Sequence, residues 1–516
     1  MVLPPAIIHP QGENLNTSKK ALSEAIEVET FDGKLFIEWD PDAAVTPLGQ
    51  LPFFIEFLKI GNLFKPWVND CPLVYNSNNA PEKIDVLGTF LLSVLSGHKR
   101  YSHITSLMND RVNCQLLGMN KVVSDDSARR SLKKIEENEG IRWLQKHLQI
   151  SYEPLLKKPW ILDTDVTVKP LYGHQQGADI GYNPHKPGRP SHTYHTYMMS
   201  NLRLVLEVEV QSGVQTQSAY SLPGLISLLD RLPVDCRPRF IRGDCDWGSD
   251  NVMSQLEARD QDYLFKLKKS KYVKELIYKH HCLGEWHRFN EGWEVKSDTL
   301  KLQSWEKERR VVIVRRRINS DSIIGMEYEK NKQKQLAFID GPEDIRVYEY
   351  AVLVTSLQDE EITILQHYRD RADCENSFDE MKNQWGWAGF TTQDLKSCQL
   401  ISRLIALVYN WWSLFVRLAH PGKKLEAITS RPLLLTSIGR LTQSGHQKCM
   451  KVTSSHGRIK QIQNTYKRLS VFFNTLKLTA PQLASRSCWE QILAKIIEEF
   501  AVAVTTHGQT MSPDSG

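Results

Sequence analysis

The stretch HYRDRADCENSFDEMKNQWGW, residues 367–387, sets four polar side chains at offsets of 0, 3, 7 and 14, namely Tyr368, Arg371, Glu375 and Lys382. On a helix that turns about 100° per residue, these side chains share one stripe roughly 60° wide. The stripe is polar, whereas a helix that faces a protein core carries an apolar stripe. The stretch therefore predicts a helix that offers one carboxylate beside two cations and a phenol, a set suited to phosphate and metal ions.

The size and composition of the chain indicate a protein of several domains. The chain has 516 residues, of which 41% are hydrophobic and 24% charged, and its net charge is +5. This length exceeds one ordinary core, so we expect roughly two to four domains of a soluble globular protein. The nine cysteines include no CxxC pair, which favours a reducing compartment over a disulfide framework or a zinc ribbon.

Two stretches bear on membranes and secretion. The N-terminus, MVLPPAIIHPQGENLNTSKK, has no basic run followed by an apolar core, so no secretory signal is expected. The most apolar window, residues 400–419, contains Arg403, Asn410 and Arg417. Charged and amide side chains inside the window predict a buried helix rather than a membrane span. We expect a cytoplasmic protein without a membrane partner.

The charge of the chain is unevenly distributed. Residues 427–489 contain no Asp or Glu but ten cations: Arg431, Arg440, Lys448, Lys451, Arg458, Lys460, Lys467, Arg468, Lys477 and Arg486. A surface of one sign attracts polyanions such as nucleic acid. Chance clustering on an ordinary solvated surface is the alternative.

The pattern of apolar residues divides the chain into five parts. Helical periodicity, strand-like alternation and loop composition place them as follows: an irregular and β segment at 1–83, a helical DNA-binding region at 84–155, an α/β core at 156–269 and 351–395, a β-rich insertion at 270–350, and a helical basic region at 396–516.

A basic helix is predicted in the second part. In SDDSARRSLKKIEENEG, residues 124–140, Ser124 is a plausible N-cap, and two acids follow it at the positive end of the helix. The helix then carries Arg129, Arg130, Lys133 and Lys134. It is either the recognition helix of a helix-turn-helix that contacts DNA or a solvated amphipathic helix.

Two predicted strands carry paired acids. Asp163 and Asp165 lie two residues apart in PWILDTDVTVKP and so share one face of a strand. Asp244 and Asp246 follow the apolar run of RPRFIRGDCDW, where a strand meets a loop. Acids at strand ends often cap turns. If the two strands are neighbours, however, acids from both converge beyond the strand ends, where open α/β sheets bind ligands.

Glu375 supplies a third carboxylate, from the helix quoted above. Oxygen ligands from separate elements suit Mg²⁺, which takes one or two carboxylates together with substrate phosphate. Two such ions activate an attacking water or hydroxyl and stabilise the leaving oxygen of a phosphodiester. Arg371 and Lys382 would then hold phosphate oxygens.

These residues carry a family resemblance. The spacing Tyr368-x2-Arg371-x3-Glu375-x6-Lys382 resembles the Tyr-x2-Arg-x3-Glu-x6-Lys signature of bacterial insertion-sequence transposases with an Asp-Asp-Glu triad. Asp165-Val166-Thr167 is similar to the first Asp-x-Thr motif of that family, and Asp244 is similar to its second acid. The resemblance covers roughly residues 155–395.

The resemblance implies a fold, an activity and a cofactor. It implies an RNase H-like mixed sheet flanked by helices, interrupted by a β-rich insertion and joined to helical N- and C-terminal regions. It further implies cut-and-paste transposition with Mg²⁺ or Mn²⁺, by a homodimer that bridges two inverted-repeat ends and joins them to target DNA in the bacterial nucleoid. Asp165, Asp244 and Glu375 would be the metal ligands and catalytic acids, and Tyr368, Arg371 and Lys382 would grip DNA phosphates.

The match has departures and open alternatives. Asp246 stands where the family pattern has glycine, so Asp246 competes with Asp244, as Asp163 competes with Asp165. Trp293 or Trp305 of the insertion could stack on a flipped base, as in some family members, or belong to its core. The loop from Gly173 to His192 is either a DNA-contacting arm or a solvated excursion.

Two other functions stay open at this point. One is an RNase H-like nuclease that cleaves DNA without strand transfer. The other is a catalytically inactive, DNA-binding descendant of a transposase, although all three acids persist in the sequence.

Overall fold

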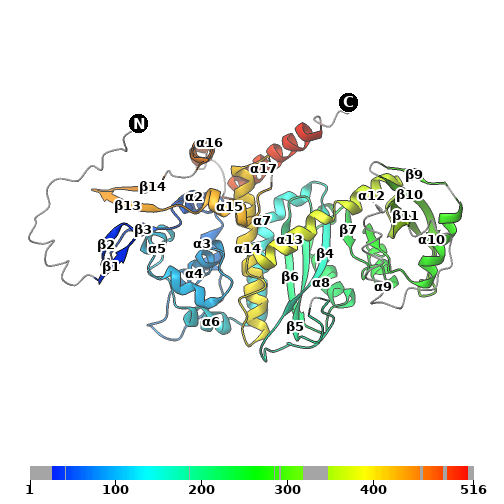
Figure 1. Cartoon of the computed structure of the whole chain (residues 1–516), viewed down its shortest axis with the longest axis horizontal. Helices are drawn as coiled ribbons and strands as arrows, with labels where there is room; N and C mark the ends of the chain where they lie inside the picture. Colours follow the sequence, from blue (N-terminus) through cyan, green and yellow to red (C-terminus); the bar gives the residue numbers. More distant parts are fainter. Residues whose placement is uncertain are drawn as a thin grey trace, which may run out of the picture.

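The structure is a computed structural model of the whole chain (Figure 1). The residues that it describes are 26–40, 42–184, 186–283, 285–289, 292–317, 347–422, 424–453, 457–479 and 485–508.

The first half of a nine-stranded mixed sheet forms the centre of the molecule. β4 (Ile161–Pro170) pairs antiparallel with β5 (Ser191–Met199), which pairs antiparallel with β6 (Leu204–Ser212). On its other side β4 pairs in parallel with β7 (Phe240–Gly243), and β7 pairs in parallel with β8 (Tyr263–Lys266). The expected RNase H-like mixed sheet flanked by helices is confirmed, and the two strands that carry the paired acids are neighbours.

The strands of the 270–350 segment continue the same sheet. β12 (Tyr348–Thr355) pairs antiparallel with β8, and β11 (Arg309–Arg317), β10 (Trp293–Leu300) and β9 (His287–Arg288) follow in that order. α10 (Lys271–Leu283) precedes these strands in the chain. The insertion therefore extends one edge of the sheet, and Figure 1 shows β9, β10 and β11 on the far side of β7 from β4.

Helices flank the sheet, and most of them follow a strand in the chain. They are α8 (Ser218–Arg231), α9 (Asp250–Glu257), α12 (Glu361–Arg369), α13 (Ala372–Asn383) and α14 (Leu395–Ala419).

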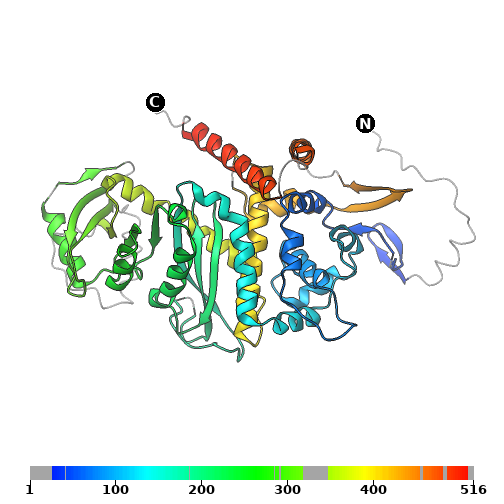
Figure 2. The ribbon, with the colours of Figure 1, turned by 180° about the vertical axis from the view of Figure 1, so that it is seen from behind.

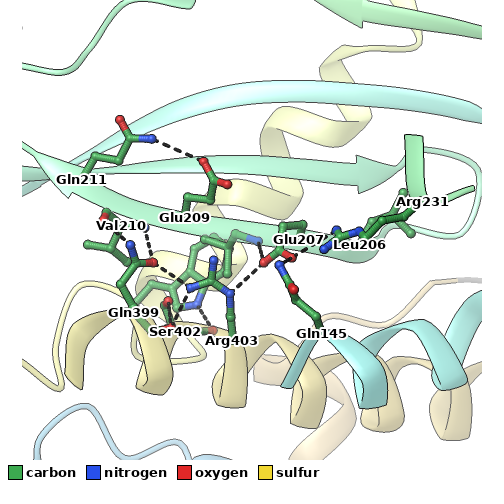
Figure 3. A network of polar contacts seen from close by, with 12 residues as sticks. Gln145, Leu206, Glu207, Glu209, Val210, Gln211, Arg231, Gln399, Ser402 and Arg403 are labelled. Carbon is green, nitrogen blue, oxygen red and sulfur yellow. Dashed lines mark hydrogen bonds and ion pairs between the residues drawn. The ribbon is translucent and has the colours of Figure 1, made fainter. Parts of the chain in front are cut away.

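The apolar window at 400–419 is buried in α14, as predicted. Views from both sides place α14 between the sheet and the N-terminal helices (Figure 1, Figure 2). Its polar groups have partners: Arg403 Nε lies 2.8 Å from Glu207 Oε1 of β6, and the Asn410 side chain bonds both backbone groups of Val205. Figure 3 shows how the surrounding amides complete the Arg403–Glu207 network. No helix among the described residues is long and apolar enough to span a bilayer.

The N-terminal region is helical beyond a two-stranded hairpin of β1 (Ile26–Thr30) and β2 (Gly33–Ile37). Its helices are α2 (Leu51–Ile60), α3 (Phe64–Asn69), α4 (Lys83–Leu95), α5 (Arg111–Leu117), α6 (Asp125–Lys134) and α7 (Glu137–Tyr152). α6 begins where its sequence predicts, because Ser124 Oγ accepts a hydrogen bond from the Ser127 N–H at 3.2 Å. α7 packs against α14 and β6.

The C-terminal region contains α15 (Ala427–Leu434), α16 (Ile459–Thr479) and α17 (Ser485–Gly508). Between α15 and α16 the chain forms a hairpin of β13 (Gly439–Ser444) and β14 (Gln447–Val452), which the expectation of a purely helical region did not include. The reason is tertiary. β3 (Val45–Thr46), from the other end of the chain, supplies the strand that pairs with β13.

Candidate active site

The stretch quoted at the outset forms two helices rather than one. α12 ends at Arg369, and α13 begins at Ala372, so the expectation of one continuous helix is wrong. The break follows from backbone bonding, because the Arg371 N–H bonds to the Tyr368 carbonyl at 3.1 Å and the Arg371 carbonyl opens the new helix toward the Cys374 N–H at 2.9 Å. Tyr368 thus lies in the last turn of α12, while Glu375 and Lys382 lie on α13.

Two aspartates from neighbouring strands open into one cavity. Asp165 lies within β4, and Asp244 follows the last residue of the adjacent parallel strand β7. A cavity of about 640 Å³ is lined by both aspartates and by Lys382 of α13. The cavity therefore lies where the strand ends of the sheet meet the helix that carries the third acid.

Arg371 links two of the three acids. Its guanidinium pairs with Glu375 one turn along the chain, and its Nη2 lies 3.4 Å from Asp165 Oδ1. Burial raises the pKa of Asp165 to about 6, against the attraction of Arg371, and the negative charges of Asp244 and Glu375 raise it further. Asp165, Asp244 and Glu375 are thus close enough for their charges to interact.

The donor atoms of this site fit a hard divalent cation. Carboxylate oxygens are the ligands that Mg²⁺ and Mn²⁺ prefer. In the described part of the chain no three His, Cys, Asp or Glu side chains stand close enough to hold a metal ion directly. At this site the guanidinium of Arg371 neutralises the acids instead, and its buried Nε has no hydrogen-bond partner. Arg371 therefore competes with a metal ion for Asp165 and Glu375.

The chain matches a known family over most of its length. The model of a family described as "Transposase DDE domain group 1" matches residues 79–472. This protein belongs to that transposase family. No curated protein sequence matches the transposase significantly. Among solved structures it is similar to a piggyBac transposase synaptic complex with hairpin DNA, with 13% identity and a TM-score of 0.37 over 87% of this chain and 85% of that one.

Asp163, the neighbour of Asp165 in the transposase, has a structural partner. Arg242 Nε and Nη2 lie 2.6 and 2.7 Å from its two carboxylate oxygens, and both side chains are buried. Arg242 also donates to Ser200 Oγ and the His367 carbonyl. Asp163 therefore joins β4 to β7, which leaves Asp165 as the acid of this strand that lines the cavity.

Asp246 lines the same cavity as Asp244 but is engaged otherwise. Its carboxylate accepts hydrogen bonds from Lys268 Nζ at 2.6 Å and from the Ser218 N–H. Burial alone would raise the pKa of Asp246, but these two bonds outweigh it and hold the pKa below the usual value. Asp246 thus joins the loop after β7 to the start of α8, through Ser218, and to Lys268, which lies just beyond β8.

The two candidate tryptophans have different surroundings. Trp305 is 4% exposed and lies under the guanidinium of Arg309, within the main hydrophobic core. Trp293 is half-buried on β10, with the guanidinium groups of Arg316 and Arg369 at 5.5 and 5.4 Å from its ring centroid. Trp293 is therefore the more accessible of the two to a base.

Two further sequence hypotheses concern basic elements. On α6, Arg130 pairs with Asp126 at 2.6 Å, and Arg129 lies within 3.6 Å of Asp125, so part of its charge is neutralised within the helix. In the loop after β4, Tyr182 and Pro184 line the cavity. His185 of that loop lies outside the described residues.

Sequence reasoning missed two residues of the site. Lys268 and Tyr182 line the cavity with the acids, yet neither belongs to a motif. Lys268 follows β8 in the run KLKK, and the position of β8 beside β7 was the only available signal. Tyr182 lies in a glycine- and proline-rich loop, whose path a sequence pattern does not predict.

Proposed function

We propose that this transposase cuts DNA at the ends of a mobile element and joins those ends to target DNA. The observation that carries the proposal is the meeting of Asp165, Asp244 and Lys382 in one cavity, with Glu375 held beside Asp165 through Arg371. Carboxylates from two strands and a helix, together with cations, are a suitable set for work on phosphodiesters. The family match supports this reading.

The three acids are proposed as the ligands of Mg²⁺ or Mn²⁺, as two ions. Such ions, when bound, activate the attacking oxygen and stabilise the leaving oxygen of a phosphodiester. Asp165 suits this role because burial, together with the charges of Asp244 and Glu375, raises its pKa to about 6 despite Arg371, and such a perturbed acid in a cavity is typical of functional sites. Asp163 is disfavoured because Arg242 donates hydrogen bonds to both of its carboxylate oxygens. Asp246 is disfavoured because its two oxygens accept hydrogen bonds from Lys268 and from the Ser218 N–H. Asp165, in contrast, lies 3.4 Å from its cation, Arg371.

The cations and the phenol are proposed to position the DNA backbone. Lys382 reaches the cavity from α13 as a point charge for a phosphate oxygen. Burial raises the pKa of Tyr368 to about 12, so its hydroxyl stays neutral and can donate a hydrogen bond to phosphate. Arg371 would exchange an acid partner for a phosphate when the DNA end arrives.

The finer parts of the proposal come from the sequence resemblance. They are a bacterial insertion-sequence origin, action in the cytoplasm at the nucleoid, inverted-repeat ends as substrate, and a homodimer that holds two ends. The basic helix α6 and the loop that contributes Tyr182 are proposed as further DNA contacts.

The test uses the DNA that flanks the coding sequence. Purified protein would be incubated with Mg²⁺ or Mn²⁺, labelled duplexes from both flanks and a supercoiled target plasmid. We expect nicks at the element ends followed by joining to the plasmid. Cleavage without any joined product would favour a nuclease, and binding without cleavage at every metal concentration would favour an inactive descendant.

A matched pair of variants assigns the role of the helical acid. Glu375→Gln removes the acid that pairs with Arg371, whereas Asp379→Asn changes an exposed acid one turn further along α13. We expect Glu375→Gln to lose cleavage by about 10³-fold or more while DNA binding persists, and Asp379→Asn to behave like the wild type. Equal activity of the two variants would contradict the assignment.

A further inference from the structure

The hairpin of β13 and β14 projects from the body of the protein (Figure 1). Most of its side chains are exposed. At the tip, Gly445 has a φ of +57°, which favours glycine, and a Cβ built there would meet no atom within 4 Å. The end of the hairpin is therefore surrounded by solvent.

One face of the hairpin carries cations directly opposite each other. Arg440 pairs in register with Lys451, and the next pairs on that face are Thr442 with Cys449 and Ser444 with Gln447. Lys448, opposite Gln443, adds a cation near the tip on the other face. Like charges on facing positions of two strands are destabilising. The face is therefore stabilised when an anion lies against it, and the Ser444 hydroxyl and Gln447 amide can donate further hydrogen bonds to that anion, whereas the Thr442 hydroxyl donates to the Cys449 carbonyl.

No acid among the described residues offsets this charge. Among the ion pairs of that part of the chain, none includes Arg440, Lys448 or Lys451. Other cations of the acid-free segment 427–489 are engaged in the fold: Arg431 is half-buried against Trp385, and Lys477 pairs with Glu56. Among the described residues, the cations of that segment that form no ion pair thus include the three on the hairpin together with Lys460 and Lys467 of α16.

The base of the hairpin is held firmly. β13 pairs with β3, and the Leu441 N–H bonds to the Ala44 carbonyl at 2.8 Å. At the root, Gly49 and Ser437 are joined by a backbone hydrogen bond of 2.8 Å, and a Cβ on Gly49 would come within 2.8 Å of the Gly439 nitrogen. A rigid mounting keeps the entropic cost of binding low.

We propose that the β13–β14 hairpin is a DNA-binding arm that grips the backbone of duplex DNA away from the site of cleavage. The inference rests on the proposed action on DNA and adds a second contact to it. The hairpin lies on the opposite side of α14 from the nine-stranded sheet, as Figure 1 and Figure 2 both show. Cations with hydroxyl and amide neighbours suit phosphate oxygens and carry no preference for base sequence.

The test compares two triple variants of equal charge change. The first is Arg440→Gln/Lys448→Gln/Lys451→Gln, and the control is Lys65→Gln/Lys157→Gln/Lys158→Gln, which removes three exposed lysines elsewhere. The probe is a fluorescent duplex of about 40 base pairs and mixed sequence, titrated at several salt concentrations. Thermal unfolding verifies that each variant is folded.

We expect the hairpin variant to bind the duplex about tenfold or more weakly at physiological salt, with a salt slope lower by about 2 to 3. The control should change affinity less than about threefold, and Arg440→Lys/Lys448→Arg/Lys451→Arg should restore binding. Affinity of the hairpin variant equal to that of the control would overturn the inference. So would a loss seen only with single-stranded RNA of the same length.

This experiment separates the two proposals. Cleavage by Glu375→Gln at the wild-type rate would refute the assigned catalysis and leave the hairpin result standing. Conversely, a hairpin variant that binds the duplex normally would refute the proposed DNA-binding arm and leave the proposed cleavage activity untouched. DNA footprints of the two triple variants should differ only at positions distant from the cut.

Discussion

Arg371 and Asp165 meet at the break between α12 and α13, with Nη2 of the first 3.4 Å from Oδ1 of the second. The same guanidinium pairs with Glu375, so one buried cation joins two acids that come from β4 and α13. An acid cluster without an ion would repel itself, and the arginine relieves that repulsion. The arrangement suits a site that exchanges a protein cation for metal and DNA phosphate.

The two acids of β4 should respond differently to neutralisation. Asp163→Asn leaves the buried Arg242 without its charge partner, and we expect it to lower the free energy of unfolding by about 3 to 5 kcal/mol. Asp165→Asn should abolish cleavage without such a loss. Urea unfolding and a nicking assay on both variants check this, and comparable stability of the two would contradict the structural role of Asp163.

The pH dependence of stability should report Asp165. Its folded pKa of about 6 lies above the usual value of 3.8, so the folded state holds the proton more tightly than the unfolded state. Asp165 therefore favours folding below about pH 4, and this contribution is lost as pH rises through about 6. Without metal, Asp165→Asn should be the more stable protein at pH 7, by up to about 3 kcal/mol. Thermal unfolding at pH 4 to 7 in EDTA measures the difference, which should vanish at the acidic end.

The affinity for metal should rise as Asp165 loses its proton, whereas the stability contribution of Asp165 falls. Protons compete with divalent ions for Asp165, so the affinity for Mn²⁺ should rise with pH through about 6 and then level off. Isothermal titration of the protein without DNA checks this. Arg371→Ala removes the competing cation, and a Mn²⁺ affinity unchanged by that variant would argue against the competition.

Lys382 should act on DNA binding more than on folding. Lys382→Ala removes one cation from the cavity, and we expect the salt slope of DNA-end binding to fall by about 1. Asp244→Asn should leave that slope nearly unchanged because it removes a proposed metal ligand. Fluorescence anisotropy at several salt concentrations distinguishes the two, and equal slopes would contradict the division.

Substituting the two tryptophans of the insertion should have different effects, one on the stability of the fold and the other on the processing of the DNA end. Trp305→Ala empties a buried site and should cost about 3 to 5 kcal/mol of unfolding free energy. Trp293→Ala should cost less. If Trp293 stacks on a displaced base, the variant should also lose the fluorescence change of 2-aminopurine placed at the DNA end. A full signal in Trp293→Ala would exclude that stacking.

Substitutions of Arg403 on α14 and Glu207 on β6 should have coupled effects on the free energy of unfolding, because the two residues form a buried ion pair. Arg403→Met leaves Glu207 charged and buried, which should cost about 3 to 5 kcal/mol. Adding Glu207→Gln removes the stranded charge and should recover part of the loss. A double-mutant cycle by urea unfolding measures the coupling between these two residues, whose contact Figure 3 shows. Strictly additive losses of unfolding free energy would show that the pair does not interact.

Local patterns were sufficient for much of this protein. The acids at two strand ends and the buried apolar window at 400–419 are each visible in short runs of sequence. The polar residues from Tyr368 to Lys382 are visible too, but they fall on two helices rather than on the one stripe that their spacing predicts. They were informative because residue type and spacing along one element already decide which side chains share a face. The strand and helix classes, and the convergence of acids near a mixed sheet, followed from them.

Other features were decided only when distant segments packed together. Asp163 and Asp165 are equivalent by spacing, and only the approach of Arg242 from β7 gives the first a structural partner. The β13–β14 hairpin depends on β3, which lies far back in the N-terminal region, and Arg371 at the helix break meets Asp165 of β4. The physical reason is that desolvation and strand pairing act on whatever is near in space, whereas the sequence by itself specifies only what is near along the chain.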